Sequence, residues 1–231
     1  YSKWYLLPAV LLLAFVPLLM YYYSFKNHLE GYPWMVHDET VDFFIHIKAV
    51  AIIVISAVML FIIAARLFME EKKVKFSVAF IPMLIYAAFV IFSSFAAENS
   101  YFVTHGIREQ FESVWVLLSY CVMTYYCFYF VNEEKDLEVL FKWFFIGAAF
   151  ICFTGVLQFA KFDPFRTDFV KKLILPQNTW KNLLDNLEFT FEKGRAYVTL
   201  YNPNYVGMYV SLAVPCLIAW MLTRKEKKAL I

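Results

Sequence analysis

Glycine and charged residues are both scarce in this sequence. The 231-residue chain has only 6 glycines, and charged residues make up 17% of it. Globular domains typically carry about 7% glycine and about 25% charged residues, so the composition excludes an ordinary soluble enzyme. The sequence also contains no glycine-rich nucleotide loop and no DxD motif. The net charge of +2 is too small to indicate a nucleic-acid partner.

Cysteine is present but is not arranged for a disulfide scaffold. The four cysteines form no CxxC pair, and all lie within long apolar runs: Cys121, Cys127, Cys152 and Cys216. Disulfides form where oxidising conditions reach the thiols, and no cysteine lies in a polar connecting segment. We therefore predict a packing role for all four.

Long apolar runs account for the composition, in which 62% of the residues are hydrophobic. A helix needs about 20 apolar residues to cross the hydrocarbon core of a bilayer, and its backbone must satisfy its own hydrogen bonds there. The sequence thus predicts an all-α polytopic membrane protein with about six transmembrane helices. We place these spans at about residues 4–23, 43–65, 77–97, 113–131, 138–160 and 203–222. The first run is too long for a signal-peptide core and is predicted to be retained.

The distribution of lysine and arginine predicts the orientation. With the N-terminus inside, the inner segments carry 11 Lys and Arg in 34 residues, and the outer segments carry 9 in 74. The positive-inside rule therefore places both termini in the cytoplasm. The centres of the spans lack ionisable groups, which disfavours an ion-coupled transporter.

The first predicted outer loop contains several metal-ligand residue types. His28, His37 and Asp42 lie in it, and His46 follows Asp42 at i,i+4 spacing. No established metal motif is present, so a solvated acidic loop is the favoured interpretation and no metal site is predicted.

The outer loop 161–200 is long for a connection, and long loops tend to be functional. Apolar residues recur at helical spacing in 180–187 and in 169–174, which predicts two short amphipathic helices. Such helices either lie on the outer leaflet and cover a site, or simply pack on the bundle. Alternation in 187–201 around Gly194 predicts a small hairpin.

The start of the sixth span carries the pattern of an anion site. Asn202 is a suitable N-cap, Pro203 a suitable first helical residue, and Asn204 follows it. We expect free backbone N–H groups and a positive dipole end there, with Arg195 folded back beside them. An arginine at a helix N-terminus suits a phosphate or diphosphate. The alternative is a capped helix whose arginine contacts lipid headgroups.

A second basic residue precedes the fourth span. Arg108 and Glu112 are four residues apart, and on a helix they would form an interfacial salt bridge. This bridge is the default interpretation from spacing alone.

Three segments of the chain resemble the O-antigen ligase and polymerase family. The segment Gly194–Pro215, with its arginine followed by Asn-Pro-Asn, is similar to the characteristic segment of that family. The segments Gly106–Glu112, followed by Leu118-Ser-Tyr, and Gly155–Phe165 are similar to two further family segments in the expected order. The resemblance covers about residues 100–222.

The resemblance implies a bacterial cytoplasmic-membrane enzyme that works on the outer face. Members transfer a glycan from an undecaprenyl diphosphate carrier to a glycan, lipid or protein acceptor, without a metal or nucleotide cofactor. The family's diphosphate-binding arginine maps onto Arg195, and Arg108 maps as a second basic residue near the substrate. With Asn202 and Asn204, these are the expected diphosphate-binding residues. Such an enzyme is a metal-independent inverting glycosyltransferase.

Two departures from the family pattern qualify this expectation. Family members are about twice as long, and their catalytic histidine lies in a later outer loop, so we expect the general base beyond Ile231 and regard the chain as the N-terminal part of such a protein. Leu200-Tyr201 also stands where glycine is commoner. The alternative function is a non-catalytic membrane module that binds lipid-linked glycan or scaffolds partner proteins.

Overall fold

Long apolar helices dominate the structure. The computed structural model describes residues 3–26, 39–69, 74–107, 110–189, 191–192 and 194–223. In that part of the chain, four helical segments are long and apolar enough to cross a membrane: α2 (His46–Met69), η4 with α3 (Val78–Phe80 and Ile81–Ala96), α6 (Glu134–Phe159) and α9 (Pro203–Thr223). Two apolar helices are shorter: Trp4–Leu18 and α5 (Val114–Phe130). The predicted class, a mostly helical membrane protein, is thereby confirmed.

Shorter elements complete the described chain. The first helix comprises η1 (Trp4–Leu6), α1 (Leu7–Val10), the π-helical η2 (Leu11–Phe15) and η3 (Val16–Leu18). The connecting segments contain β1 (Tyr23–Lys26), β2 (Glu39–Asp42), α4 (Ser100–His105), η5 (Pro164–Arg166), α7 (Asp168–Ile174), η6 (Gln177–Thr179) and α8 (Trp180–Leu183).

The first helix ends at Leu18, earlier than the predicted residue 23. Leu19 is already extended, and the carbonyls near this end take partners from distant segments. Thr199 Oγ1 donates to the carbonyl of Pro17, and Lys48 Nζ donates to that of Leu19. Residues that follow pair as a sheet, so the prediction of helix to residue 23 was wrong.

A two-stranded antiparallel sheet, which the all-α prediction did not include, follows this helix. β1 pairs with β2 in the register Tyr23 with Asp42 and Phe25 with Thr40. Asp42, the last residue of β2, holds the turn that leads into α2, because its Oδ2 accepts the backbone N–H groups of Phe44, Ile45 and His46 at 2.8–3.1 Å. The bond from His46 satisfies a donor that the start of a helix leaves free.

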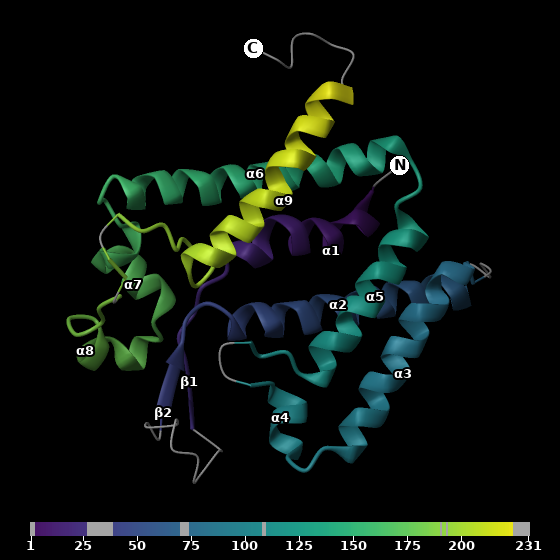
Figure 1. Cartoon of the computed structure of the whole chain (residues 1–231), viewed down its shortest axis with the longest axis horizontal. Helices are drawn as coiled ribbons and strands as arrows, with labels where there is room; N and C mark the ends of the chain where they lie inside the picture. The colour runs from purple at the N-terminus through teal and green to yellow at the C-terminus, as the bar shows by residue number, and fades with distance from the viewer. Residues whose placement is uncertain are drawn as a thin grey trace.

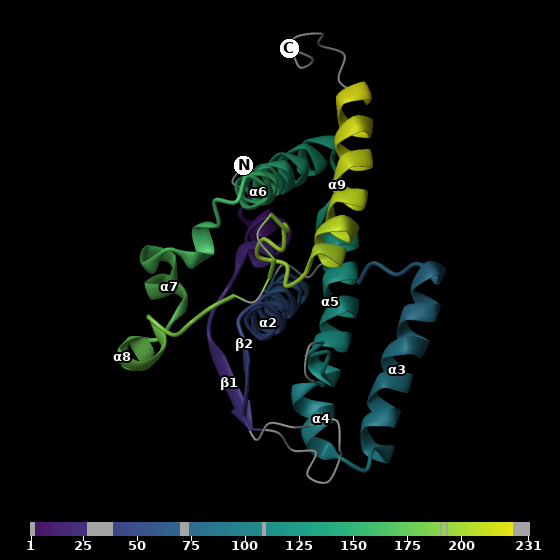
Figure 2. The same cartoon turned by 60° about the vertical axis from the view of Figure 1, so that its left-hand side comes forward.

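Packing joins the helices around α1 and α2. In Figure 1, α1 lies between α2 and α6, while α5 contacts both α2 and α3. Figures 1 and 2 both show α9 crossing α6, which it contacts. The sheet, α4, α7 and α8 lie toward the lower and left side of Figure 1, whereas the α5–α6 link and the end of α9 lie at the top. The described parts of the three segments predicted to share one membrane face therefore lie on one side of the molecule.

The long helices expose apolar side chains as lipid-facing helices do. Phe92 and Phe95 of α3 are 70% and 83% exposed, and Leu212 of α9 is 69% exposed. Large contiguous apolar surfaces are rare on soluble monomers, and a bilayer would cover the exposed apolar side chains of these helices.

Close contact between α6 and the first helix depends on Gly147. A Cβ at this position would lie 2.8 Å from the carbonyl oxygen of Ala14, whereas nothing lies within 4 Å of a Cβ at Gly207. We expect Gly147→Ala to destabilise the protein by about 1–3 kcal/mol, because two backbones must separate. Gly207→Ala is the matched control and should be neutral or stabilising by up to about 1 kcal/mol. Thermal unfolding in the same detergent measures the stability of the two variants. Equal melting temperatures of Gly147→Ala and Gly207→Ala would contradict this packing.

Candidate anion-binding site

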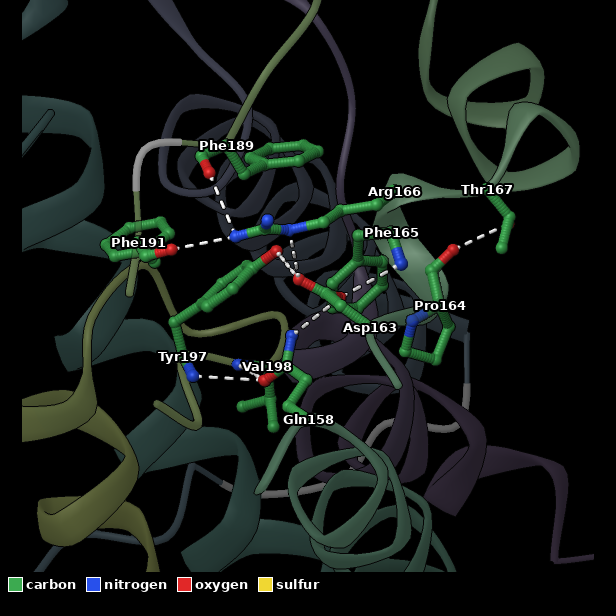
Figure 3. Close-up of polar contacts among 10 residues, drawn as sticks. All are labelled: Gln158, Asp163, Pro164, Phe165, Arg166, Thr167, Phe189, Phe191, Tyr197 and Val198. Carbon is green, nitrogen blue, oxygen red and sulfur yellow. Dashed lines mark hydrogen bonds and ion pairs between the residues drawn. The ribbon is translucent and has the colours of Figure 1, made fainter. Parts of the chain in front are cut away.

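A polar cluster fixes the chain that follows α6 (Figure 3). Asp163 is its centre: Oδ2 accepts from Tyr197 Oη at 2.6 Å and from Arg166 Nε at 3.2 Å. Its Oδ1 accepts from Gln158 Nε2 and from the backbone N–H of Phe165, each at 3.1 Å. The cluster thus ties the last turn of α6 to the segment that precedes α9.

The backbone of that segment is held in an unusual conformation. Val198 has φ of 43°, a left-handed value that a β-branched residue rarely adopts. The side chain of Gln158 stabilises it, since Oε1 accepts the N–H groups of Tyr197 and Val198 at 3.0 and 2.9 Å. Burial, together with the hydrogen bond to the Asp163 carboxylate, raises the pKa of Tyr197. Its hydroxyl therefore stays protonated and keeps donating across the physiological pH range.

Arg166 completes the cluster from the other side. Its Nη2 donates to the carbonyl oxygens of Phe189 and Phe191 at 3.1 and 2.7 Å. Together with the bond from Nε to Asp163, these contacts engage two of the three guanidinium nitrogens with protein groups. Arg166 is therefore a structural cation, and its charge is largely balanced by Asp163.

Lys48 anchors the far end of the same segment. Its ammonium donates to the carbonyls of Thr199, Phe44 and Leu19 at 2.6, 2.6 and 2.8 Å. All three of its donors are thereby used. The segment 195–200 is thus held by α6 at one end and by the first turn of α2 at the other.

A cavity of about 350 Å³ lies beside this segment. Its lining residues are Lys161, Phe162, Asp163, Arg166, Glu192, Gly194 and Arg195. Three cations face two carboxylates, so the lining has a formal excess of positive charge. The side chains of Lys161 and Arg195 are exposed and make no hydrogen bond or ion pair with any other described residue. These two groups can bind an anion without losing an existing partner.

The start of α9 differs in part from the expectation. Asn202 is confirmed as the cap, since its Oδ1 accepts the N–H groups of Asn204 and Tyr205 at 2.9 and 3.2 Å. Its carbonyl accepts the N–H of Val206, and Pro203 has no N–H. The prediction of free N–H groups was therefore wrong, because the cap already satisfies them. Neither Asn202 nor Asn204 lines the cavity that contains Arg195.

Arg108 lies outside the described residues, as do His28 and His37. Asp42 and His46, the other two residues considered as metal ligands, have local roles. Asp42 accepts the N–H of His46 at the start of α2, and the His46 ring stacks on Tyr23. Among the described residues, no group of three His, Cys, Asp or Glu side chains is arranged to hold a metal ion.

The predicted hairpin at 187–201 is wrong. The described residues of this segment contain no strand, because the N–H groups of Tyr197 and Val198 bond to a side chain of α6. The amphipathic helices are confirmed in outline as α7 and the shorter η6–α8. Their apolar faces pack on a core around Phe44, Phe165 and Tyr197, although Phe169 of α7 is 78% exposed.

Two residues of the site were not predicted from the sequence: Lys161 and Gln158. Gln158 is a polar residue near the end of the predicted fifth span, and this position was the available signal for it. The structure buries its side chain. Lys161, with φ of 66°, lies in the turn that follows α6, two residues after its last residue Phe159. No sequence pattern indicates that Lys161 lines a cavity with Arg195.

Comparisons with known proteins add no relative. No family model matches the chain, and neither a curated protein nor a solved structure matches it. Fold and site together define a helical membrane protein with a basic cavity at one side of its helices.

Proposed function

We propose that the protein is a membrane glycan transferase of the O-antigen ligase and polymerase type. It moves a glycan from an undecaprenyl diphosphate carrier to a glycan, lipid or protein acceptor on the outer face of the bacterial cytoplasmic membrane. The basic cavity is the observation that carries this proposal. Its two uncommitted cations, Lys161 and Arg195, suit a diphosphate.

The chemistry of the lining fits a diphosphate leaving group. An inverting transfer needs an acceptor hydroxyl activated by a base and a leaving group whose charge is neutralised. Arg195 can bind two phosphate oxygens through its planar fork, and Lys161 supplies a point charge beside it. Asp163 does not compete for them, because Arg166 and Tyr197 already donate to its Oδ2, and Gln158 and the Phe165 N–H donate to its Oδ1.

The position of the cavity suits a substrate that is anchored in lipid. Its lining residues lie in 161–166, just after the membrane-length apolar helix α6, and in 192–195, in the segment that leads to α9. The lysine and arginine distribution supports assigning this side of the molecule to the outer face.

Donor binding tests the proposal. In the purified full-length protein in lipid nanodiscs, we expect Arg195→Ala and Lys161→Ala each to weaken binding of undecaprenyl diphosphate about 10- to 100-fold, since each removes a charge-assisted hydrogen bond. Lys181→Ala is the matched control, because Lys181 is exposed on α8 and does not line the cavity. Unchanged affinity in both cavity variants would contradict the proposal. Saturable binding with no glycan transfer would instead identify a non-catalytic binding module.

A further inference from the structure

The short helix α7 has two apolar sides, and protein covers only one of them. Val170 and Ile174, four residues apart, pack on the core of the connecting region. Phe169 and Leu173, also four residues apart, lie on an adjacent side of the helix and are 78% and 71% exposed. A helix that packs by one side and meets water by the rest carries polar residues on the rest, so this second apolar side needs a partner other than water.

The exposed apolar surface of α6 leads to the region of α7. Phe153, Val156 and Phe159 recur at intervals of three residues along the last turns of α6, and all three are exposed. Phe159 is the last residue of α6, and Phe162, in the turn that follows, is exposed as well. Because α6 is apolar and of membrane length, a bilayer is the medium that covers these side chains. The lipid-facing surface of α6 therefore continues to the point where the helix leaves the membrane.

α7 is held close to that point. η5 contacts both α6 and α7, and Figures 1 and 2 both show α7 beside the end of α6. The connection is short and fixed, because Asp163 accepts hydrogen bonds from the Phe165 N–H and from Arg166 Nε. The exposed side of α7 thus lies near the level at which α6 passes from hydrocarbon to headgroups.

The residue types on this side of α7 suit the boundary between acyl chains and headgroups. Lys172 is exposed beside Leu173, and its Nζ lies 5.9 Å from the centre of the Trp180 ring. Its ammonium makes no hydrogen bond or ion pair with any other described residue, so its donors are free for lipid phosphates. Interfacial helices combine lysine with phenylalanine and leucine in this way, and their apolar sides lie about 5–10 Å into the boundary.

A bilayer fits this small surface better than a second protein does. Stable protein interfaces bury about 1,200 Å² or more in total, which two side chains cannot supply. A bilayer has no such threshold, because it already surrounds α6 and needs only to reach α7.

We propose that Phe169 and Leu173 insert into the membrane leaflet that meets the end of α6, with Lys172 at the level of the lipid phosphates. α7 is then an interfacial helix that anchors the connection between α6 and α9 to the bilayer. This inference does not depend on the proposed function, because any lipid leaflet supplies the partner.

Spin labels test this proposal in the full-length protein in nanodiscs of phosphatidylcholine and phosphatidylglycerol. The four cysteines among the described residues are replaced by alanine, and Phe169→Cys, Leu173→Cys and Asp185→Cys each receive one nitroxide. Asp185→Cys is the matched control, because Asp185 is exposed in the same connecting region. Collisions of the label with oxygen, which concentrates among acyl chains, are compared with collisions with a water-soluble nickel complex. We expect the oxygen-to-nickel ratio at positions 169 and 173 to be at least about threefold higher than at position 185.

A second variant separates insertion from simple exposure. Phe169→Asp places a charge on the inserting side, so it should lower the ratio for a label at position 173 to the value at position 185, whereas Phe169→Leu should leave it unchanged. Because Phe169 is exposed, neither substitution removes a packing contact that the fold needs. Equal ratios at positions 169, 173 and 185 would overturn the proposal and place α7 in water. Low collision rates with both reagents, with spin–spin broadening that grows with the labelled fraction, would overturn it in favour of a second copy of the chain.

Discussion

Under the proposed function, alanine at Arg195 is expected to abolish glycan transfer while leaving membrane insertion normal. The leaving diphosphate gains charge as the glycosidic bond breaks, and removal of one preorganised donor to such a group typically costs about 10²–10³ in rate. The side chain has no bond to another described residue, so its loss should not unfold the site. Transfer from a lipid-linked donor in membranes that contain the full-length protein measures this effect.

Two further variants define what Arg195 contributes. Arg195→Lys should restore little activity, because lysine keeps the charge but loses the bidentate fork. Lys181→Ala should transfer normally at matched protein levels. Full transfer by Arg195→Ala would show that this cavity is not the donor site.

Asp163→Ala is expected to release the segment between α6 and α9. Asp163 accepts hydrogen bonds from Gln158, Phe165, Arg166 and Tyr197, and its side chain is only 12% exposed. Truncation leaves the guanidinium and the buried tyrosine hydroxyl without their acceptor. A loss of about 3 kcal/mol in local stability follows from breaking such a charged, largely buried network.

Hydrogen–deuterium exchange measures that loss. Amides of residues 194–200 should exchange faster by about two orders of magnitude in Asp163→Ala, since 1.4 kcal/mol corresponds to about a factor of 10. Asp185→Ala is the control, because Asp185 is exposed in the same connecting region. Equal exchange rates in the two variants would show that the cluster does not hold the segment.

Helix positions followed from the sequence wherever apolar length alone decided them. α9 begins at the expected Pro203, since Asn202 caps it within the same turn. The predicted first helix was too long, because the observed end depends on Thr199 and Lys48, which lie far along the chain. The β1–β2 sheet was not predicted, because its strands are short and the segment that joins them has the composition of a loop.

The site was predictable only in its exposed arginine. Its residue type and its spacing from Asn202 singled out Arg195 as a neighbour of the α9 N-terminus, whereas the structure places it in a cavity that neither Asn202 nor Asn204 lines. Its partner Lys161 was not predicted, because the cavity arises from the Gln158 and Asp163 contacts that bring the end of α6 to residues 194–200. Buried polar contacts between distant segments are fixed by tertiary packing, and no local pattern predicts their partners.

Chemical protection of Arg195 tests the central claim most directly. The full-length protein in nanodiscs is treated with phenylglyoxal, which modifies accessible arginines, and the modified sites are identified by mass spectrometry. We predict that undecaprenyl diphosphate slows modification of Arg195 and that undecaprenol, which has the same chain without a charged head, does not. Equal rates of Arg195 modification in the presence of undecaprenyl diphosphate and of undecaprenol would contradict a diphosphate site at this cavity.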